Sequence, residues 1–224
     1  MNINQKGIAI LIICLIVIAL GSYSYSRIAS SPSDIPSPSP SELIFNTGQA
    51  TATPAQTPST RQIKQYRNFP GVLTTANLQN KVAVIETKKG TIAIEIYPEA
   101  TKAASNFIQL TRDGFYDGVT FHRVEPGFVV QGGDPLGTGS GGPGYKFEDE
   151  PVTKPYNRGI VAMANSGPNT NGSQFFIMLD NHPELPPKYT IFGKVLQGME
   201  VVDKLAVGDV MSKVTIQEIS KAGP

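Results

Sequence analysis

The sequence predicts a mostly antiparallel, closed β-sheet whose open ends are covered by two helices, and three observations support this fold class. Many short runs of β-branched and aromatic residues follow Lys81, Gly- and Pro-rich turns separate them, and only two segments have helical periodicity. Before about Asn68 the chain is instead continuously apolar or rich in Ser, Pro and Thr. We therefore expect one mainly-β domain after a non-globular leader.

Residues 1–26 have the pattern of a signal peptide or a membrane anchor. An unbroken apolar run extends from Ile8 to Leu20 and is preceded by Lys6. The run is shorter than the about 20 residues that a spanning helix usually needs, which favours a cleaved signal peptide. Tyr23 and Tyr25 favour an uncleaved anchor instead, as interfacial aromatics. Both alternatives predict an extracytoplasmic domain, in a periplasm, a lumen or the cell envelope, that is exported or membrane-anchored.

Residues 27–68 are predicted to be a disordered linker, because Pro, Ser and Thr dominate its composition and cannot bury enough apolar surface to form a core. The globular domain is expected at residues 69–224, with its core at 82–219. Within residues 61–80 two alternatives stay open. Phe69, Val72 and Leu73 either pack on the edge of the domain or continue the linker.

The elements of the domain follow from periodicity. Residues 82–87 and 91–97 alternate apolar and polar side chains around Gly90, which predicts a hairpin. A helix is predicted from Thr101, because the apolar residues between Ala103 and Leu110 share one face and Gly114 follows. Further strands are expected at residues 119–124, 128–131, 160–164, 175–179, 191–195 and 214–219, and a second short helix at 199–206.

Composition excludes several classes of function. Lys plus Arg total 19 against 18 Asp plus Glu, so no basic excess favours nucleic acid as a partner. The only cysteine, Cys14, lies in the apolar leader, so the domain has no disulfide or thiolate nucleophile. His122 and His182 lie in unrelated segments without carboxylates at ligand spacing, and no serine lies in a nucleophile elbow. We therefore expect no metal and no other cofactor.

Polar donors and aromatic residues remain, without acid–base partners. They are Arg123, Gln131, Asn165, Gln174, Phe128 and Phe176. Such a set suits a reaction in which no covalent bond to the enzyme forms. Rotation about an Xaa-Pro bond is such a reaction, since it is slow only because twisting the amide destroys its resonance, a barrier of roughly 18–20 kcal/mol.

Five blocks make the sequence specific: Phe121-His122-Arg123-Val124, Pro126 to Asp134, Lys146 to Glu150, Met163 to Ile177, and Phe192-Gly193-Lys194-Val195. In order and spacing they resemble the signature blocks of the cyclophilin family, in its compact bacterial form. The resemblance covers roughly Val82 to Ile219. It implies an eight-stranded antiparallel barrel capped by two α-helices, with a peptide groove on its outer face.

The resemblance also implies a role for individual residues. Arg123 matches the catalytic arginine, and its permanent charge suits stabilisation of a twisted amide whose prolyl nitrogen has regained its lone pair. Gln131 is assigned to the catalytic set, and with Asn165 and Gln174 it matches positions that bind the substrate backbone. The proline pocket is matched by Phe128, Val129, Phe176 and Leu185, and the groove walls by Gly137, Ala164 and Tyr189.

Two functions are therefore weighed. The first is an active isomerase that assists folding of exported or membrane-associated proteins, and the alternative is a non-catalytic domain that binds prolyl peptides as a scaffold. Retention of Arg123 favours the enzyme. We expect a monomer whose substrates are proline-containing polypeptides. Glu184 stands where many members of the family carry Trp, which predicts weaker binding of the inhibitor cyclosporin.

Overall fold

The computed structural model of the chain describes residues 63–219. The predicted leader, residues 1–26, and most of the predicted linker lie outside the described residues. Within residues 63–219 no helix is long and apolar enough to span a bilayer.

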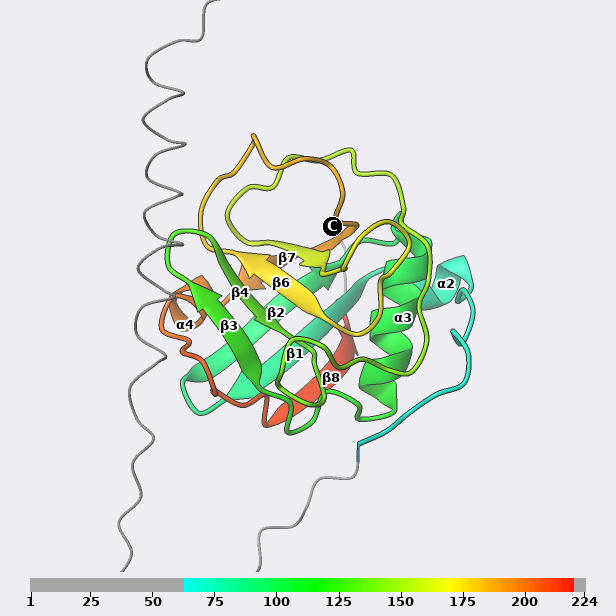
Figure 1. Cartoon of the computed structure of the whole chain (residues 1–224), viewed down its shortest axis with the longest axis horizontal. Helices are drawn as coiled ribbons and strands as arrows, with labels where there is room; N and C mark the ends of the chain where they lie inside the picture. Colours follow the sequence, from blue (N-terminus) through cyan, green and yellow to red (C-terminus); the bar gives the residue numbers. More distant parts are fainter. Residues whose placement is uncertain (1–62, 220–224) are drawn as a thin grey trace, which may run out of the picture. The chain divides into compact units, whose positions relative to one another are not determined.

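Eight strands form one antiparallel sheet (Figure 1). They are β1 (Lys81–Thr87), β2 (Gly90–Ile96), β3 (Phe121–Glu125), β4 (Val129–Gly132), β5 (Ile160–Met163), β6 (Phe175–Met178), β7 (Ile191–Gln197) and β8 (Lys213–Glu218), in the spatial order β3-β4-β6-β5-β7-β2-β1-β8. The eight predicted strands are thereby confirmed, and their ends differ from the predicted ends by no more than two residues.

The expected closed barrel is replaced by a half-barrel. Strands β3 and β8 are the two edges of the sheet, and no ladder joins them in the described part of the chain. They are linked instead through the segment before β8. Thr120 forms an antiparallel bridge with Val210, and the N–H of Phe121 donates to the carbonyl of Asp209 at 2.8 Å.

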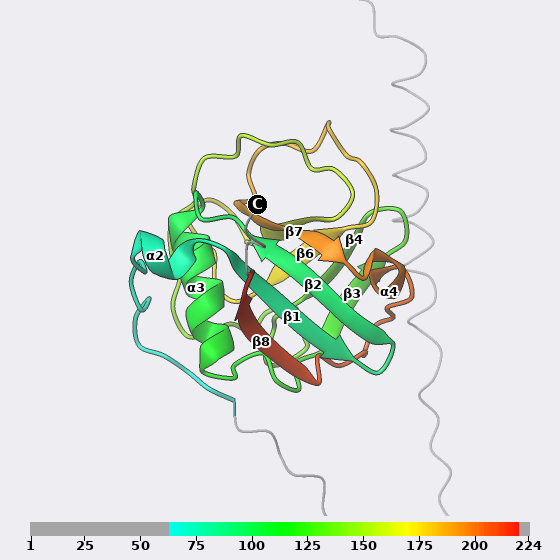
Figure 2. The ribbon, with the colours of Figure 1, turned by 180° about the vertical axis from the view of Figure 1, so that it is seen from behind.

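The two predicted helices lie at opposite ends of the half-barrel, as the front and back views both show (Figures 1 and 2), and both contribute side chains to the same main core. The predicted first helix is α3 (Thr101–Arg112), whose N-terminus is capped from a distance, since the backbone N–H groups of Lys102 and Ala103 donate to the Glu150 carboxylate at 2.9 Å. The predicted second helix is only the single turn α4 (Met199–Val202). Beyond it the bonds tighten to i→i−3, as in Leu205 N–H to the Val202 carbonyl at 3.1 Å, so the helix ends.

Strands β5 and β6 bury every side chain, which explains their continuous apolar sequences, and β4 buries every residue except the half-buried Gln131. Alternation along each strand divides these side chains between two clusters. Val130 and Phe175 point into the main core with α3, whereas Val129 and Phe176 point to a second cluster on the outer face. This outer cluster, completed by Tyr156, Ile160, Ala162, Met178 and Ile191, is the floor on which a site can be built.

The chain before β1 packs on the domain. We call residues 63–74 the N-terminal strap, and it leads into the one-turn helix α2 (Thr75–Leu78). Phe69 and Leu73 pack against the main core, so for them the first of the two alternatives holds, whereas Val72 is 54% exposed. Tyr66 also packs against the main core.

Candidate active site

The register of the sheet places the main site residues in one row. Arg123 on β3 lies opposite Gln131 on β4, Gln131 lies opposite Phe176 on β6, and Phe176 lies opposite Ala162 on β5. Directly opposed residues of paired antiparallel strands share a face of the sheet. A cation, an amide, an aromatic ring and a small residue are therefore held side by side by four strands.

Over this row lies a pocket of about 600 Å³, which we call the proline pocket after the role that the resemblance implies for it. Its lining residues come from three strands and four loops: His122, Arg123, Phe128, Val129, Gln131, Thr138, Gly139, Ala164, Asn165, Phe176, Leu185 and Tyr189. Apolar walls around a few polar groups are typical of small-ligand sites.

Arg123 lies at the rim of the proline pocket, with its side chain 42% exposed. Its guanidinium carbon is 5.8 Å from the centre of the Phe128 ring, close enough for a cation–π contact. Nε and Nη2 donate to Glu125 Oε1 at 2.9 and 2.7 Å, and Nη1 donates to Gln131 Oε1 at 3.0 Å. The guanidinium is thus fixed on two sides while it faces the apolar pocket.

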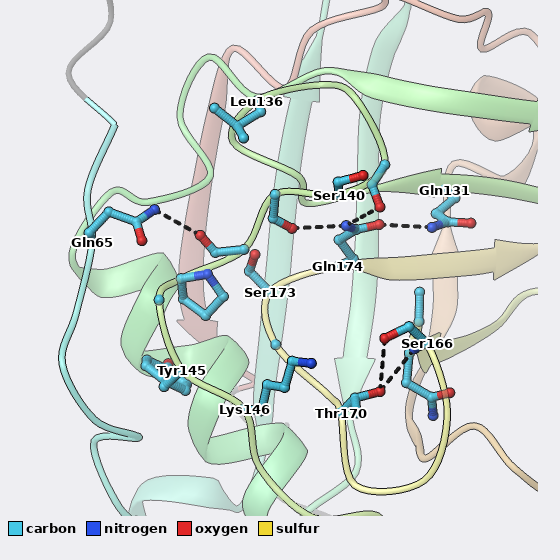
Figure 3. A pocket seen from close by; sticks show the side chains of 18 residues that line it. Gln65, Gln131, Leu136, Ser140, Tyr145, Lys146, Ser166, Thr170, Ser173 and Gln174 are labelled. Carbon is cyan, nitrogen blue, oxygen red and sulfur yellow. Dashed lines mark hydrogen bonds between the residues drawn. The ribbon is translucent and has the colours of Figure 1, made fainter.

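The amide of Gln131 is oriented by a chain of hydrogen bonds (Figure 3). Gln174 Nε2 donates to the carbonyls of Gly139 and Gly141 at 3.0 and 2.9 Å, so Gln174 Oε1 must act as an acceptor. That oxygen accepts from Gln131 Nε2 at 2.9 Å, which leaves Gln131 Oε1 to accept from Arg123. Residues 137–144, which we call the glycine-rich loop, therefore determine how the carboxamide beside Arg123 is turned.

The glycine-rich loop is itself held by Asp134, which is 1% exposed. The carboxylate accepts from the N–H groups of Leu136, Thr138 and Gly139 at 2.7, 2.9 and 2.5 Å. Burial opposes ionisation of Asp134, but the backbone N–H donors, that of Leu136 foremost, outweigh it and lower the pKa of the carboxyl. Asp134 is therefore a buried anion whose charge is balanced by backbone dipoles.

His122 lines the same pocket next to Arg123 in sequence. Burial lowers the pKa of His122, against the opposing field of Asp134, so the imidazole is neutral at pH 7. Arg123 is then the only charged side chain among the residues that line the proline pocket. Within residues 63–219 no group of three or more His, Cys, Asp or Glu side chains is placed to hold a metal ion.

A second histidine supports the opposite wall. His182 faces the Gly127 carbonyl through Nε2 and Glu184 through Nδ1, both at 2.8 Å, and its ring meets Phe128 edge-on with centroids 5.0 Å apart. The hydrogen bond to Gly127, and then that to Glu184, raise the pKa of His182. The loop that carries the pocket residue Leu185 is thereby tied to the turn below Phe128.

Nine of the sequence-assigned site residues line the proline pocket, namely Arg123, Phe128, Val129, Gln131, Ala164, Asn165, Phe176, Leu185 and Tyr189. Gln174 reaches it through Gln131. Gly137 does not line it; its neighbours Thr138 and Gly139 form that wall, because the bonds to Asp134 set the path of the loop. Thr138, Gly139 and the Arg123 partner Glu125 were not singled out from the sequence, since only the loop path and the strand register reveal them.

Asn165 is held by the protein itself. Its Nδ2 donates to the carbonyl of Lys188 at 2.9 Å, and its Oδ1 accepts from the N–H of Gly167. The side-chain amide thus joins two rims of the groove.

The half-barrel carries an apolar outer pocket with a fixed cation and oriented amides at its rim. This arrangement is typical of enzymes that bind an apolar ring and stabilise polar groups of the substrate beside it. Residues 81–221 match the family described as cyclophilin type peptidyl-prolyl cis-trans isomerase/CLD.

Curated relatives agree. The chain is 46% identical over 137 residues to a peptidyl-prolyl cis-trans isomerase of Helicobacter pylori, covering 59% of this chain and 84% of the relative. It is 48% identical over 129 residues to peptidyl-prolyl cis-trans isomerase B of Bacillus subtilis, covering 56% of this chain and 90% of the relative. A crystal structure of a Cryptosporidium parvum cyclophilin type isomerase superposes with a TM-score of 0.59 at 35% identity, over 62% of this chain and 99% of that one.

The chain therefore belongs to the cyclophilin family, and it is a peptidyl-prolyl cis/trans isomerase. Its substrates are proline-containing peptides.

Proposed function

We propose that this isomerase acts on proline-containing segments of exported or membrane-associated proteins, and that Arg123 is the residue that stabilises the half-rotated amide. The observation that carries the proposal is the position of the guanidinium, 5.8 Å from the ring of Phe128 at the rim of the proline pocket. As the Xaa-Pro bond twists, the prolyl nitrogen regains its lone pair and becomes a stronger acceptor, so a fixed cation binds the twisted state better than either planar state.

The number of free donors on Arg123 supports this role. A guanidinium has five N–H donors, and three of them are used, two on Glu125 and one on Gln131. Two donors remain, one on each Nη, for the substrate amide. Because Glu125 and Gln131 already fix the orientation, little side-chain entropy is lost when the substrate binds.

The aromatic side chains define where the proline ring binds. Phe176 is 6% exposed and meets Tyr189 edge-on at 5.6 Å, which creates a stiff apolar corner. A second Cryptosporidium parvum structure of the same isomerase was determined in the presence of the dipeptide Ala-Pro, and that structure is 35% identical to this chain with a TM-score of 0.58. We assign the corner between Phe128 and Phe176 to the proline ring, and Gln131 with Asn165 to the peptide backbone.

Peptide isomerisation by the full chain tests the role of Arg123. Arg123→Ala is expected to lower kcat/KM for an Xaa-Pro peptide at least tenfold, about 1.4 kcal/mol of transition-state stabilisation. Arg158→Ala is the matched control, because Arg158 is a 41% exposed, ion-paired arginine on Asp203 that lines no part of the proline pocket. Equal rates for the Arg123→Ala and Arg158→Ala proteins would refute the mechanism.

The part of the proposal that names exported or membrane-associated proteins as substrates rests on the leader. The apolar run from Ile8 to Leu20 and the Pro-rich linker after it support export or anchoring of the domain outside the cytoplasm, where it would work as a monomer. N-terminal sequencing of the mature protein, together with cell fractionation, tests this part. A protein found in the cytoplasm with its leader intact would overturn the extracytoplasmic assignment and leave the enzymatic one unaffected.

A further inference from the structure

A second cavity continues from the proline pocket. This outer pocket has a volume of about 960 Å³ and shares Gln131, Gly139, Ala164 and Asn165 with the proline pocket (Figure 3). Because the two cavities are continuous, a polypeptide whose proline lies at Phe176 places its flanking residues on one side in the outer pocket.

Gln65 forms one end of the outer pocket, across from Gln131 (Figure 3). Of the residues that line the cavity, it alone precedes residues 81–221, the part of the chain that matches the family. It is carried by the N-terminal strap. Whatever Gln65 contributes to the groove therefore comes from a segment outside the matched domain.

Two hydrogen bonds seat this part of the strap on the glycine-rich loop. Gln65 Nε2 donates to the carbonyl of Gly142 at 3.0 Å, and the N–H of Tyr66 donates to the carbonyl of Pro143 at 2.7 Å. The approach is close, because a Cβ on Gly144 would lie 2.6 Å from the carbonyl oxygen of Tyr66. Glycine at position 144, with φ of +98°, is thus required for the strap to sit where it does.

The strap stays in place independently of Gln65. Farther along, the N–H of Leu73 donates to Ser105 Oγ at 2.8 Å, and Gln109 Nε2 donates to the carbonyl of Gly71 at 2.8 Å. Phe69 stacks on Phe147 with centroids 5.2 Å apart. Removal of the Gln65 side chain should therefore change the wall of the pocket without releasing the segment.

The hydrogen bond that Gln65 Nε2 donates determines the orientation of the Gln65 carboxamide. Since Nε2 is committed to the Gly142 carbonyl, Oε1 is the free end of the amide, and it accepts no hydrogen bond from the described residues. A free carbonyl-type oxygen at the edge of a polar cavity is suited to the N–H of an extended peptide or to a hydroxyl or amide side chain.

We propose that Gln65 is a specificity-determining residue of this isomerase, which contacts polar groups of the substrate in the residues that flank the proline. The proposal rests on the assignment of the proline pocket above. It gives the strap a function in substrate selection: long polypeptides reach Gln65, whereas minimal prolyl peptides do not.

The test compares two peptides on the full chain, a blocked Ala-Pro unit and the same unit extended by several polar residues on each side. In Gln65→Ala the ratio of kcat/KM for the long peptide to that for the short one is expected to fall about threefold, mainly through KM. Asn68→Ala is the matched control, because Asn68 is an exposed amide of the same strap that lines neither pocket. Its ratio should equal that of the wild type.

An unchanged ratio in Gln65→Ala would overturn the proposal, whether both peptides lose rate equally or neither loses any. Failure of the underlying site assignment has a different signature. In that case Arg123→Ala would retain wild-type activity on the short peptide, which does not reach Gln65.

Discussion

Replacement of Asp134 by Asn tests whether a buried carboxylate organises the glycine-rich loop. Asp134 is 1% exposed and accepts three backbone N–H groups, two of them on Oδ2. An asparagine of the same shape can turn its oxygen toward Thr138 and Gly139, but its amino group then faces the N–H of Leu136. One buried donor loses its acceptor, and two bonds lose their charge.

The magnitude follows from these three bonds. A hydrogen bond to a charged group contributes about 1.5–3 kcal/mol and a neutral one about 0.5–1.5, so the lost bond and the two weakened bonds together cost about 3.5–6 kcal/mol. Because a domain is typically stable by about 5–15 kcal/mol, the variant should still fold at low temperature. The loop also sets Gln174 through the carbonyls of Gly139 and Gly141, so kcat/KM of the folded variant should fall as well.

Urea unfolding followed by tyrosine fluorescence measures the change, since the chain has 8 Tyr and no Trp. Asp180→Asn is the control, because Asp180 is exposed and, among residues 63–219, its carboxylate accepts a hydrogen bond only from the adjacent N–H of Asn181. A loss of less than about 1 kcal/mol in Asp134→Asn would refute the reasoning, because it would mean that the loop N–H groups do not depend on the carboxylate.

Three further predictions concern the same region. Glu125→Gln should lower kcat/KM up to about fivefold, because the neutral amide holds the Arg123 guanidinium in place less firmly than the carboxylate does. The unfolding free energy should change little, because the Arg123–Glu125 ion pair is half-exposed. An unchanged rate would show that Gln131 alone fixes the guanidinium. Gly133→Ala should lower the unfolding free energy by at least about 3 kcal/mol in urea titrations, since a Cβ would lie 2.3 Å from the Ser173 carbonyl oxygen at φ +85°. Gly208→Ala is the control: it has a similar φ of +92° but open space around the new Cβ, so it should cost only about 1–2 kcal/mol. Equal costs would contradict the steric argument. Because the pKa of His182 is raised, the stability that its protonation contributes is fully present below the ordinary pKa of 6.5 and is lost as pH rises through the raised pKa. The difference in unfolding free energy between the wild type and His182→Gln should therefore shrink from acidic to alkaline pH. A difference that grows with pH would contradict this sign.

The strands and the row of site residues were predictable because period-2 patterns and sequence blocks are local. Phe175-Phe176 is an example: alternation requires that one ring enter the core and the other leave it, and the structure places Phe175 inside and Phe176 on the outer face. Once β3, β4 and β6 are in register, Arg123 and Gln131 must be neighbours of Phe176.

Other parts of the site depend on contacts that no local pattern encodes. Gln65 meets Gly142 from 77 residues away, and the path of the glycine-rich loop depends on a single carboxylate, which puts Gly139 rather than Gly137 at the wall. The second helix was predicted too long for a similar reason. Its apolar pattern continues past Val202, but the backbone bonds of that turn do not.

The aromatic contacts of the strap determine where a shortened form of this protein can begin. Tyr66 and Phe69 lie against Tyr145 and Phe147, with ring centroids 5.2–6.3 Å apart. An expression fragment that starts at Lys81, where the family match begins, lacks Tyr66 and Phe69 and would expose the ring faces of Tyr145 and Phe147 to water. Such an exposed aromatic surface would promote self-association. The smallest piece that keeps its own surface intact therefore begins upstream of the family boundary, before Tyr66.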